Sequence, residues 1–350
     1  MTAICSPLPH QVDRQYKSNR GVFAGRAGER VRRVASRTVR AATIRDGKIV
    51  VEEHPDPRPQ AGELLVRVRA AGLNGADLHQ LAGRYPAPPG WPQDIPGLEL
   101  AGEVVETGDG VFRLEPGDRV MALVAGGGQA ELAVVHESGA MPVPEELDWT
   151  AAGGVPEVFC TAHDALFTQA GLTVGERLLV HGAAGGVGMA AVQLGTMAGA
   201  RVTATVRDEH CRERIAALGV NALAPDEFVE AGPFDVILEL VGAPNFPANL
   251  DALALGGRIG VVGIGGGAQI ELNLGSLMHK RVRMFGTVMR ARSLEQKAMM
   301  TRGVERSVLP GFASGDLAIP VAATYPLEDV AAAYERFQAG GKLGKIVLEM

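Results

Sequence analysis

Residues 176–188, ERLLVHGAAGGVG, constrain the fold of this chain more than any other stretch. A largely apolar run at residues 178–181 leads into small residues, and residues 189–199 then show a helical pattern. Glycines at a strand-to-helix turn let the backbone approach a phosphate group, and the free N–H groups at the helix start favour an anion. The stretch predicts a nucleotide-binding turn, although glycine-rich turns without a ligand also join strands to helices.

Strands and helices alternate along the chain around this turn. A helix is expected at 161–171, strands at 177–182, 201–206, 234–241, 257–263 and 281–288, and helices at 187–199, 208–218 and 246–254. This βαβ order predicts an α/β fold whose doubly wound parallel sheet is of the Rossmann type and spans residues 161–305.

A different pattern precedes that region, as expected for a chain of 350 residues with about two domains. Short strands separated by Gly and Pro turns are expected at 41–44, 48–51, 64–71, 100–106, 118–124 and 130–135. Such spacing predicts a compact β-barrel-like domain over residues 39–160. A helix at 327–338 and a strand at 345–349 predict that residues 306–350 complete this first domain.

Residues 1–38 are rich in Arg, Gly and Ser and lack hydrophobic periodicity, which predicts a poorly ordered N-terminal extension. Two interpretations stay open. The composition suits an organelle transit peptide, but we favour a translation start placed too early, with the protein proper beginning near Val39.

Charge and cysteine usage exclude several classes of protein. Nine basic and two acidic residues in the first 40 positions leave the remainder with a formal charge of −13, which argues against nucleic acid as a partner. The three cysteines lie far apart and form no disulfide framework. No apolar run reaches the roughly 18 residues of a membrane span. We therefore expect a soluble, cytoplasmic protein without a membrane segment.

Several segments carry a resemblance to a known family. They include AAGLNGAD at 70–77, GRYP at 83–86, PGLELAGEV at 96–104, VPEVFCTA at 155–162 and GGRIGVVG at 256–263. Together they resemble the medium-chain dehydrogenase/reductase superfamily and, within it, the zinc-independent quinone oxidoreductases. Residues 280–297, KRVRMFGTVMRARSLEQK, are similar to the p53-inducible quinone oxidoreductase branch. The resemblance implies a GroES-like catalytic domain, a Rossmann domain that binds NADP, a cleft between them, and a homodimer formed through the sheet edge near residues 282–288.

The same comparison predicts that no metal is bound. Zinc-using relatives carry a Cys where Asn74 stands and a His where Leu98 stands. Neither Asn nor Leu supplies a thiolate or an imidazole. His181, at the end of an expected strand, is most simply structural, and no spacing of the other His and Cys residues rebuilds a zinc site.

Cofactor choice is expected at the end of the second strand, where an acid binds the ribose of NAD and a cation accommodates the extra phosphate of NADP. This end holds Arg207 and no acid, and Arg212 follows one turn later. The pattern predicts NADPH. The adjacent Asp208 complicates the local charge, and Pro225 stands where relatives often have a tyrosine. Both arginines could also be solvated surface charges.

The expected chemistry is hydride transfer to a quinone or an α,β-unsaturated carbonyl, because such acceptors need little polarisation by a metal. The resemblance places Asn74 and Tyr85 at the nicotinamide and substrate, where Tyr85 could donate a hydrogen bond to the substrate oxygen. Tyr85 could instead be a packing residue of a Pro-rich loop. The other residues expected at the cofactor are Thr161, Ala184, Gly185, Gly186, Val187, Val241, Gly242, Gly263, Met289 and Arg290.

Three functions fit this sequence. The leading hypothesis is an NADPH-dependent quinone reductase with a small-molecule quinone or enone as substrate. The same site could reduce enoyl or alkenal double bonds. A weakly catalytic dinucleotide-binding protein, similar to the lens crystallins of this family, is the third possibility.

Overall fold

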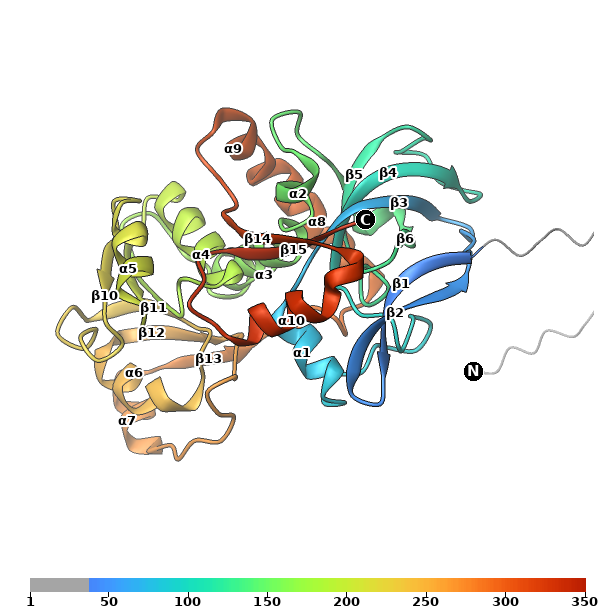
Figure 1. Cartoon of the computed structure of the whole chain (residues 1–350). Coiled ribbons are helices and arrows are strands. Elements are labelled where there is room, and N and C mark those ends of the chain that lie inside the picture. The colour runs from blue at the N-terminus through green and yellow to red at the C-terminus, as the bar shows by residue number, and fades with distance from the viewer. Residues whose placement is uncertain (1–37) are drawn as a thin grey trace, which may run out of the picture. The chain divides into compact units, whose positions relative to one another are not determined.

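The computed structural model describes residues 38–350, so the extension expected at residues 1–38 lies outside the described residues except for its last position (Figure 1). Strands β1 (Thr38–Arg45) and β2 (Lys48–Pro55) form an antiparallel hairpin. Asp46 and Gly47 both have positive φ angles, 50° and 72°. An Asp-Gly pair in this conformation makes the tight turn whose twist suits two antiparallel strands.

The first domain contains a seven-stranded sheet. Its strands are β3 (Glu63–Gly72), β4 (Glu99–Thr107), β5 (Arg119–Leu123), β6 (Leu132–His136), β7 (Ala140–Pro142), β14 (Val321–Pro326) and β15 (Lys345–Glu349). The order is β14-β15-β3-β4-β5-β7, and β6 also pairs with β3. Leu64, Val66 and Val68 of β3 are buried while Arg67 is exposed, which is the alternation of a strand with one solvated face.

Short helices connect and flank this sheet. They are α1 (Gly75–Leu81), a 3-10 helix at Glu137–Gly139, α2 (Trp149–Ala152) and α3 (Pro156–His163), which a π-helix at Asp164–Gln169 extends. The expected helix at 161–171 therefore began too late. Proline is favoured at the first helical position because its missing N–H has no intrahelical partner there, and Pro156 occupies that position in α3.

The second domain is built on a six-stranded, all-parallel sheet in the order β10-β9-β8-β11-β12-β13. The strands are β8 (Arg177–His181), β9 (Arg201–Thr205), β10 (Asn221–Leu223), β11 (Phe234–Glu239), β12 (Leu253–Val261) and β13 (Arg283–Gly286). The predicted α/β class and doubly wound sheet are confirmed. Strand β13 is shorter than the expected 281–288.

Helices connect these strands: α4 (Gly186–Met197), α5 (Glu209–Ala216), a 3-10 helix at Ala243–Asn245, α6 (Phe246–Ala252) and α7 (Leu274–Lys280). Helices α8 (Leu294–Ser307) and α9 (Leu309–Ser314) follow β13. The chain moves outward from β8 to β10 and then returns to β11 on the other side of β8. The carboxyl ends of β8 and β11 thus form the switch point at which such sheets bind ligands.

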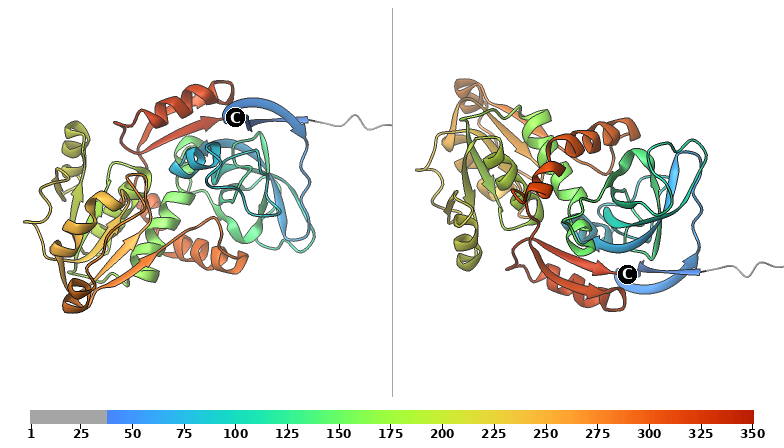
Figure 2. Two further views of the ribbon diagram at one scale, coloured as in Figure 1. Left: turned by 90° about the horizontal axis from the view of Figure 1, so that it is seen from below. Right: turned by 90° about the horizontal axis from the view of Figure 1, so that it is seen from above.

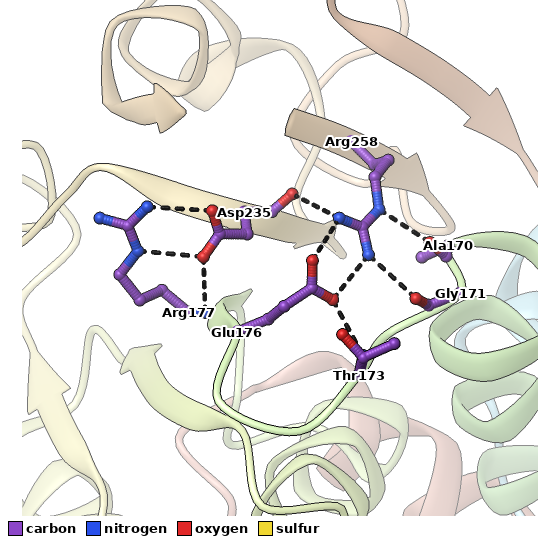
Figure 3. A network of polar contacts seen from close by, with 7 residues as sticks. All are labelled: Ala170, Gly171, Thr173, Glu176, Arg177, Asp235 and Arg258. Atoms are coloured by element: carbon purple, nitrogen blue, oxygen red, sulfur yellow. Dashed lines mark hydrogen bonds and ion pairs between the residues drawn. The ribbon is translucent and has the colours of Figure 1, made fainter. Parts of the chain in front are cut away.

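Ion pairs connect strands of the parallel sheet near their amino ends (Figure 3). The Arg258 guanidinium donates to both carboxylate oxygens of Glu176, at 2.7 and 2.8 Å, and to the carbonyl oxygen of Ala170. Arg177 forms a bidentate pair with Asp235 in the neighbouring strand. These contacts join β8, β11 and β12 at one end and leave their carboxyl ends to the loops of the site.

His181 has the structural role expected of it. The ring is fully buried, with 2.8 Å between Nδ1 and Thr205 Oγ1 and 2.7 Å between Nε2 and Asn249 Oδ1. It also packs edge-on against Phe228. Because burial penalises the charged ring, the pKa of His181 is lowered and the imidazole is neutral at pH 7.

The end of the chain returns to the first sheet. A 3-10 helix at Leu327–Asp329 leads into α10 (Val330–Gln338), and β15 then pairs antiparallel with β3. Figure 2 shows these closing segments beside the β1–β2 hairpin, and α10 contacts β2. The expected strand at 345–349 is confirmed, and the boundaries at residues 160 and 305 stay predictions. No helix within residues 38–350 is both long and apolar enough to cross a bilayer.

Candidate active site

Three loops meet at the carboxyl ends of β8, β11 and β12. A Cβ added to Gly182, after β8, would lie 3.3 Å from Val241 Cγ2, after β11. A Cβ added to Gly263, after β12, would lie 2.2 Å from the carbonyl oxygen of Leu240. The carboxylate of Glu239 holds this region by accepting hydrogen bonds from the backbone N–H groups of Val241 and Gly242. The predicted residues Val241, Gly242 and Gly263 are therefore neighbours of the glycine-rich turn.

The glycine-rich turn and the first turn of α4, residues 182–188, have a geometry suited to binding an anion. A Cβ on Gly188 would lie 2.6 Å from Ala183 Cα and from the Gly182 carbonyl oxygen, so only glycine fits. Within residues 38–350, the backbone N–H groups of residues 186–188, the first turn of α4, have no acceptor, and no side chain caps this helix. Three such free donors at a helix start favour a phosphate.

The other predicted residues of this stretch lie in the turn itself or at the start of α4. The carbonyl oxygen of Ala184 accepts a hydrogen bond from the N–H of Gly344 at 2.9 Å, which joins the turn to the segment that leads into β15. A Cβ on Gly186 would lie 2.7 Å from Val158 Cγ1 of α3. Gly185 is the N-cap residue of α4, and Val187 belongs to its first turn.

Thr161 of α3 is an orphaned polar group. Its side chain is buried, and its hydroxyl has no hydrogen-bond partner in the described part of the chain. An unpaired buried hydroxyl costs free energy that a bound polar ligand would recover. The uncapped α4 and this hydroxyl fit a dinucleotide, whose phosphates would meet the N–H groups of α4.

Asn74 caps α1 and belongs to a buried polar network. Its Nδ2 donates to Glu99 Oε1 at 2.9 Å, and its Oδ1 accepts from Lys345 Nζ at 2.8 Å. The Lys345 ammonium also lies 2.5 Å from Glu99 Oε1. The amide of Asn74 is thus oriented by an acid from β4 and a cation from β15.

Asp77 braces the loop around this network. Its carboxylate accepts from the N–H groups of Asn74 and Gly97, at 2.8 and 3.3 Å, and from Gln129 Nε2 at 3.3 Å. Tyr334 in turn donates its hydroxyl to Gln129 at 2.9 Å. Burial raises the pKa of Asp77 to about 6.

Tyr85 lies in the loop after α1, under the guanidinium of Arg290. Arg290 is buried and donates to the carbonyl oxygens of Tyr85 and Ala125 and to Oε1 of Gln80, each at 2.7 Å. The guanidinium carbon is 5.1 Å from the centre of the Tyr85 ring. Arg290 therefore holds the Tyr85 loop in place, and its predicted cofactor contact stays a prediction.

Residues next to Arg290 are also engaged within the protein. Met289 is 4% exposed and belongs to the main hydrophobic core, so its predicted cofactor contact stays a prediction. Lys297 of α8 donates to the carbonyl oxygen of Arg290 at 3.1 Å and lies over the ring of Trp91. Through Arg290 and Lys297, the segment that follows β13 thus contacts the Pro-rich loop at both Tyr85 and Trp91.

Arg207 follows the end of β9, and its predicted contact with a phosphate stays a prediction. Its side chain is exposed and has no partner among residues 38–350. Arg212 is half-buried and donates to the carbonyl oxygen of Val206 at 3.3 Å. The neighbouring Asp208 accepts from the N–H of Cys211 and caps α5, so its carboxylate is committed to the helix.

The donor set at Asn74 does not suit a metal ion. Within the described residues, no group of three His, Cys, Asp or Glu side chains could hold a metal. Leu98 is buried and apolar, and Asn74 is bonded to an ammonium group that would repel a second cation.

Sequence reasoning missed four of the charged members of this site. Glu99 and Lys345 are 0% and 2% exposed, and they form an ion pair although they lie far apart in the sequence. Glu157 and Lys297 were also overlooked. A signal existed for three of them, because Glu99, Glu157 and Lys345 are charged residues within segments that are otherwise apolar. Such residues are rarely buried unless they are paired.

The fold and the site define a dinucleotide-dependent oxidoreductase. The family described as "Alcohol dehydrogenase GroES-like domain" matches residues 60–145, and that described as "Zinc-binding dehydrogenase" matches residues 186–303. The chain is 33% identical to a quinone oxidoreductase of Rattus norvegicus over 306 residues, which cover 83% of this chain and 90% of that protein. It is 30% identical to an acryloyl-coenzyme A reductase of Metallosphaera sedula, over 85% of this chain and 95% of that protein.

Solved structures agree with these matches. A thermostable alcohol dehydrogenase from Pyrobaculum aerophilum superposes with a TM-score of 0.78 at 28% identity, covering 90% of this chain and all of that chain. This chain belongs to the medium-chain dehydrogenase/reductase superfamily, as the sequence predicted. Membership implies an oxidoreductase that uses a nicotinamide dinucleotide, NAD or NADP, and acts on a small molecule.

Proposed function

We propose that this protein is a zinc-independent, NADPH-dependent quinone reductase. The observation that carries this proposal is the network of Asn74, Glu99 and Lys345, which puts an amide and an ammonium where zinc-using relatives have a metal ligand. A site of this kind offers hydrogen-bond donors rather than a Lewis acid. It suits an acceptor that is electrophilic without metal polarisation.

The reduced nicotinamide, when bound, supplies a hydride. The free N–H groups of residues 186–188 would hold the pyrophosphate, with Ala184 and Gly185 forming the turn below it. Thr161, Val241, Gly242 and Gly263 would contact the nicotinamide half of the molecule. This assignment is supported by the unpaired Thr161 hydroxyl and by the meeting of the three loops at one edge.

Arg207 supports NADPH rather than NADH. Its guanidinium is exposed and free to pair with the 2′-phosphate, and Asp208 beside it is occupied as a helix cap. Arg212 would assist from the first turns of α5. A tighter Kd for NADPH than for NADH, measured by fluorescence titration, is the expected result, and an equal or tighter Kd for NADH would contradict it.

Tyr85 and Asn74 would orient the substrate. Burial and the nearby charge of Glu157 raise the pKa of Tyr85 to about 12, so its hydroxyl keeps its proton and acts as a hydrogen-bond donor. Oxygen atoms that gain charge during the reduction are stabilised by such donors. Asn74 would contact the nicotinamide with its side-chain amide, whose orientation is fixed by Glu99 and Lys345.

The test of the substrate class is an acceptor screen. NADPH oxidation is followed by stopped-flow absorbance with a quinone and with an enal, and zinc is quantified in the purified protein. Faster turnover of the quinone without bound zinc supports the proposal. The similarity to an acryloyl-coenzyme A reductase makes enoyl reduction the second candidate, and faster turnover of the enal would favour it. NADPH binding without oxidation by any acceptor would favour the crystallin-like alternative.

We also propose a cytoplasmic homodimer that does not bind nucleic acid. Strand β13 is one of the two edge strands of the parallel sheet, and Met284 on it is 37% exposed. Leu274 and Met278 of the adjacent α7 are 67% and 74% exposed. An edge strand flanked by exposed apolar side chains is suited to pairing with a second copy across a twofold axis.

A further inference from the structure

Glu157 has a carboxyl group to which the proposed reaction assigns no role. It is the second residue of α3, and its backbone N–H donates to Glu99 Oε2 at 2.8 Å. Within residues 38–350, its own carboxyl group forms no hydrogen bond or ion pair. The neighbouring Glu99 and Asp77, by contrast, each accept from three groups.

The position of α3 places this free carboxyl group in the candidate site. Val158, the next residue, lies beside Gly186 at the start of α4. Thr161 follows Glu157 by four residues, so the two side chains share one face of the helix. That face therefore holds two polar groups without a partner among residues 38–350, a carboxyl and a hydroxyl, on the helix that contacts the first residue of α4.

Charged residues on several neighbouring elements act on the carboxyl group of Glu157. Negative charge comes from Glu99 on β4 and Asp77 on α1, and positive charge from Lys345 on β15 and Lys297 on α8. Arg290 and Tyr85 on the facing loops, and Cys160 on α3 itself, are influenced by its charge. The cations are already bonded, Lys345 to Glu99 and Lys297 to the Arg290 carbonyl oxygen.

Burial and the negative charge of the adjacent Glu99 raise the pKa of Glu157, and the two lysines lower it by less. The resulting pKa of Glu157 is about 8. The carboxyl group is therefore protonated at pH 7, and it can donate a hydrogen bond or a proton. A group with a pKa near the working pH is well suited to general acid catalysis.

We propose that Glu157 is the proton donor that completes the reduction of the acceptor. This inference rests on the proposed function. The acceptor gains a hydride with its electron pair at one carbon, and a π pair moves onto the conjugated oxygen. The O–H bond of Glu157 then breaks, and its proton passes to that oxygen. The dinucleotide is oxidised and the acceptor is reduced, and a proton from water restores the acid.

The proposal is tested with Glu157→Gln and with a control, Glu115→Gln, at an exposed position whose side chain has no partner among residues 38–350. Quinone reduction is measured from pH 6 to 9. Wild type and the control should lose activity as the pH rises through about 8. Glu157→Gln should be slower at pH 7 by about a hundredfold, without that inflection, and should bind NADPH within about twofold of wild type.

A second readout needs no cofactor. Between the ordinary pKa of 4.5 and the raised value of about 8, the native state binds a proton that the unfolded state has released. The free energy of unfolding of wild type should therefore fall as the pH rises through this window. Glu157→Gln should lack this part of the slope, so its melting temperature should rise relative to wild type between pH 5 and 9. Glu115→Gln should follow wild type.

The outcomes separate the two proposals. If wild type reduces no acceptor, the proposed function fails, and the role of Glu157 fails with it. If wild type reduces a quinone and Glu157→Gln keeps the wild-type rate and inflection, only the proton-donor role is overturned. Should Glu157→Gln not fold, Glu157→Asp replaces it. A reduced rate with a retained inflection would support the role, and a wild-type rate with no inflection would overturn it.

Discussion

Nζ of Lys345 lies 2.5 Å from Oε1 of Glu99, although the two residues are 246 positions apart in the sequence. The pair joins β15, the last strand of the chain, to β4 in the middle of the first sheet. Both side chains are buried, and each also bonds to the amide of Asn74. One ion pair thus closes the first domain and orients a candidate site residue.

Replacing Lys345 by Met should destabilise the protein strongly. The change leaves the Glu99 carboxylate buried beside Asn74 without its cation, which costs about 3–5 kcal/mol. Chemical denaturation measures the loss, and Lys48→Met, at an exposed position of the hairpin, serves as control. The double variant with Glu99→Gln should recover part of the loss. A Lys345→Met variant as stable as the control would contradict this prediction.

Arg290→Lys should weaken substrate binding more than turnover. A lysine cannot reproduce the planar set of donors that reaches Tyr85, Ala125 and Gln80. The Tyr85 loop should become less ordered, so we expect a several-fold higher KM for a quinone and a smaller change in kcat. Arg84→Lys, an exposed residue of the same loop, is the matched control. Unchanged KM in Arg290→Lys would refute the role assigned to this arginine.

Gly188→Ala should impair both folding and dinucleotide binding. The new Cβ would lie 2.6 Å from the backbone of the turn, so the turn or α4 must shift. Such overpacking costs about 1–3 kcal/mol. Gly265→Ala adds a Cβ with no atom within 4 Å and should change the free energy of unfolding little. Equal denaturation midpoints for the two variants would show that the close approach at Gly188 is unimportant.

Arg207→Ala should reduce the preference for NADPH. Loss of a charge-assisted contact to the 2′-phosphate should raise the Kd for NADPH by about tenfold or more, and leave the Kd for NADH within about twofold. Arg214→Ala on α5, also exposed, should alter neither. A parallel change in both Kd values would assign the phosphate contact to another residue.

Met284→Asp should disrupt the proposed dimer. A charged side chain on an edge strand opposes pairing with a second strand because it must then be buried. Light scattering coupled to size-exclusion chromatography should report a dimer for wild type and a monomer for the variant. Dimers of equal stability in both proteins would place the interface elsewhere.

Local sequence patterns predicted most of the second domain. The run of small residues at the glycine-rich turn and the alternation of strands and helices are local signals, and β8, α4 and β9 lie within one or two residues of the expected positions. Other elements were missed, the shortest of them because their signals are weak. Strands β7 and β10 have three residues each, and α9 has six.

The amino-acid sequence alone determined the family, the parallel sheet and the glycine-rich turn, because these depend on residues close together in the chain. Tertiary structure decided which charged residues share the site. Lys345 meets Glu99, and Arg290 meets Gln80, only when distant strands are assembled. The protonation state of Glu157 was decided in the same way, since burial and the nearness of Glu99, rather than residue type, raise the pKa of its carboxyl group.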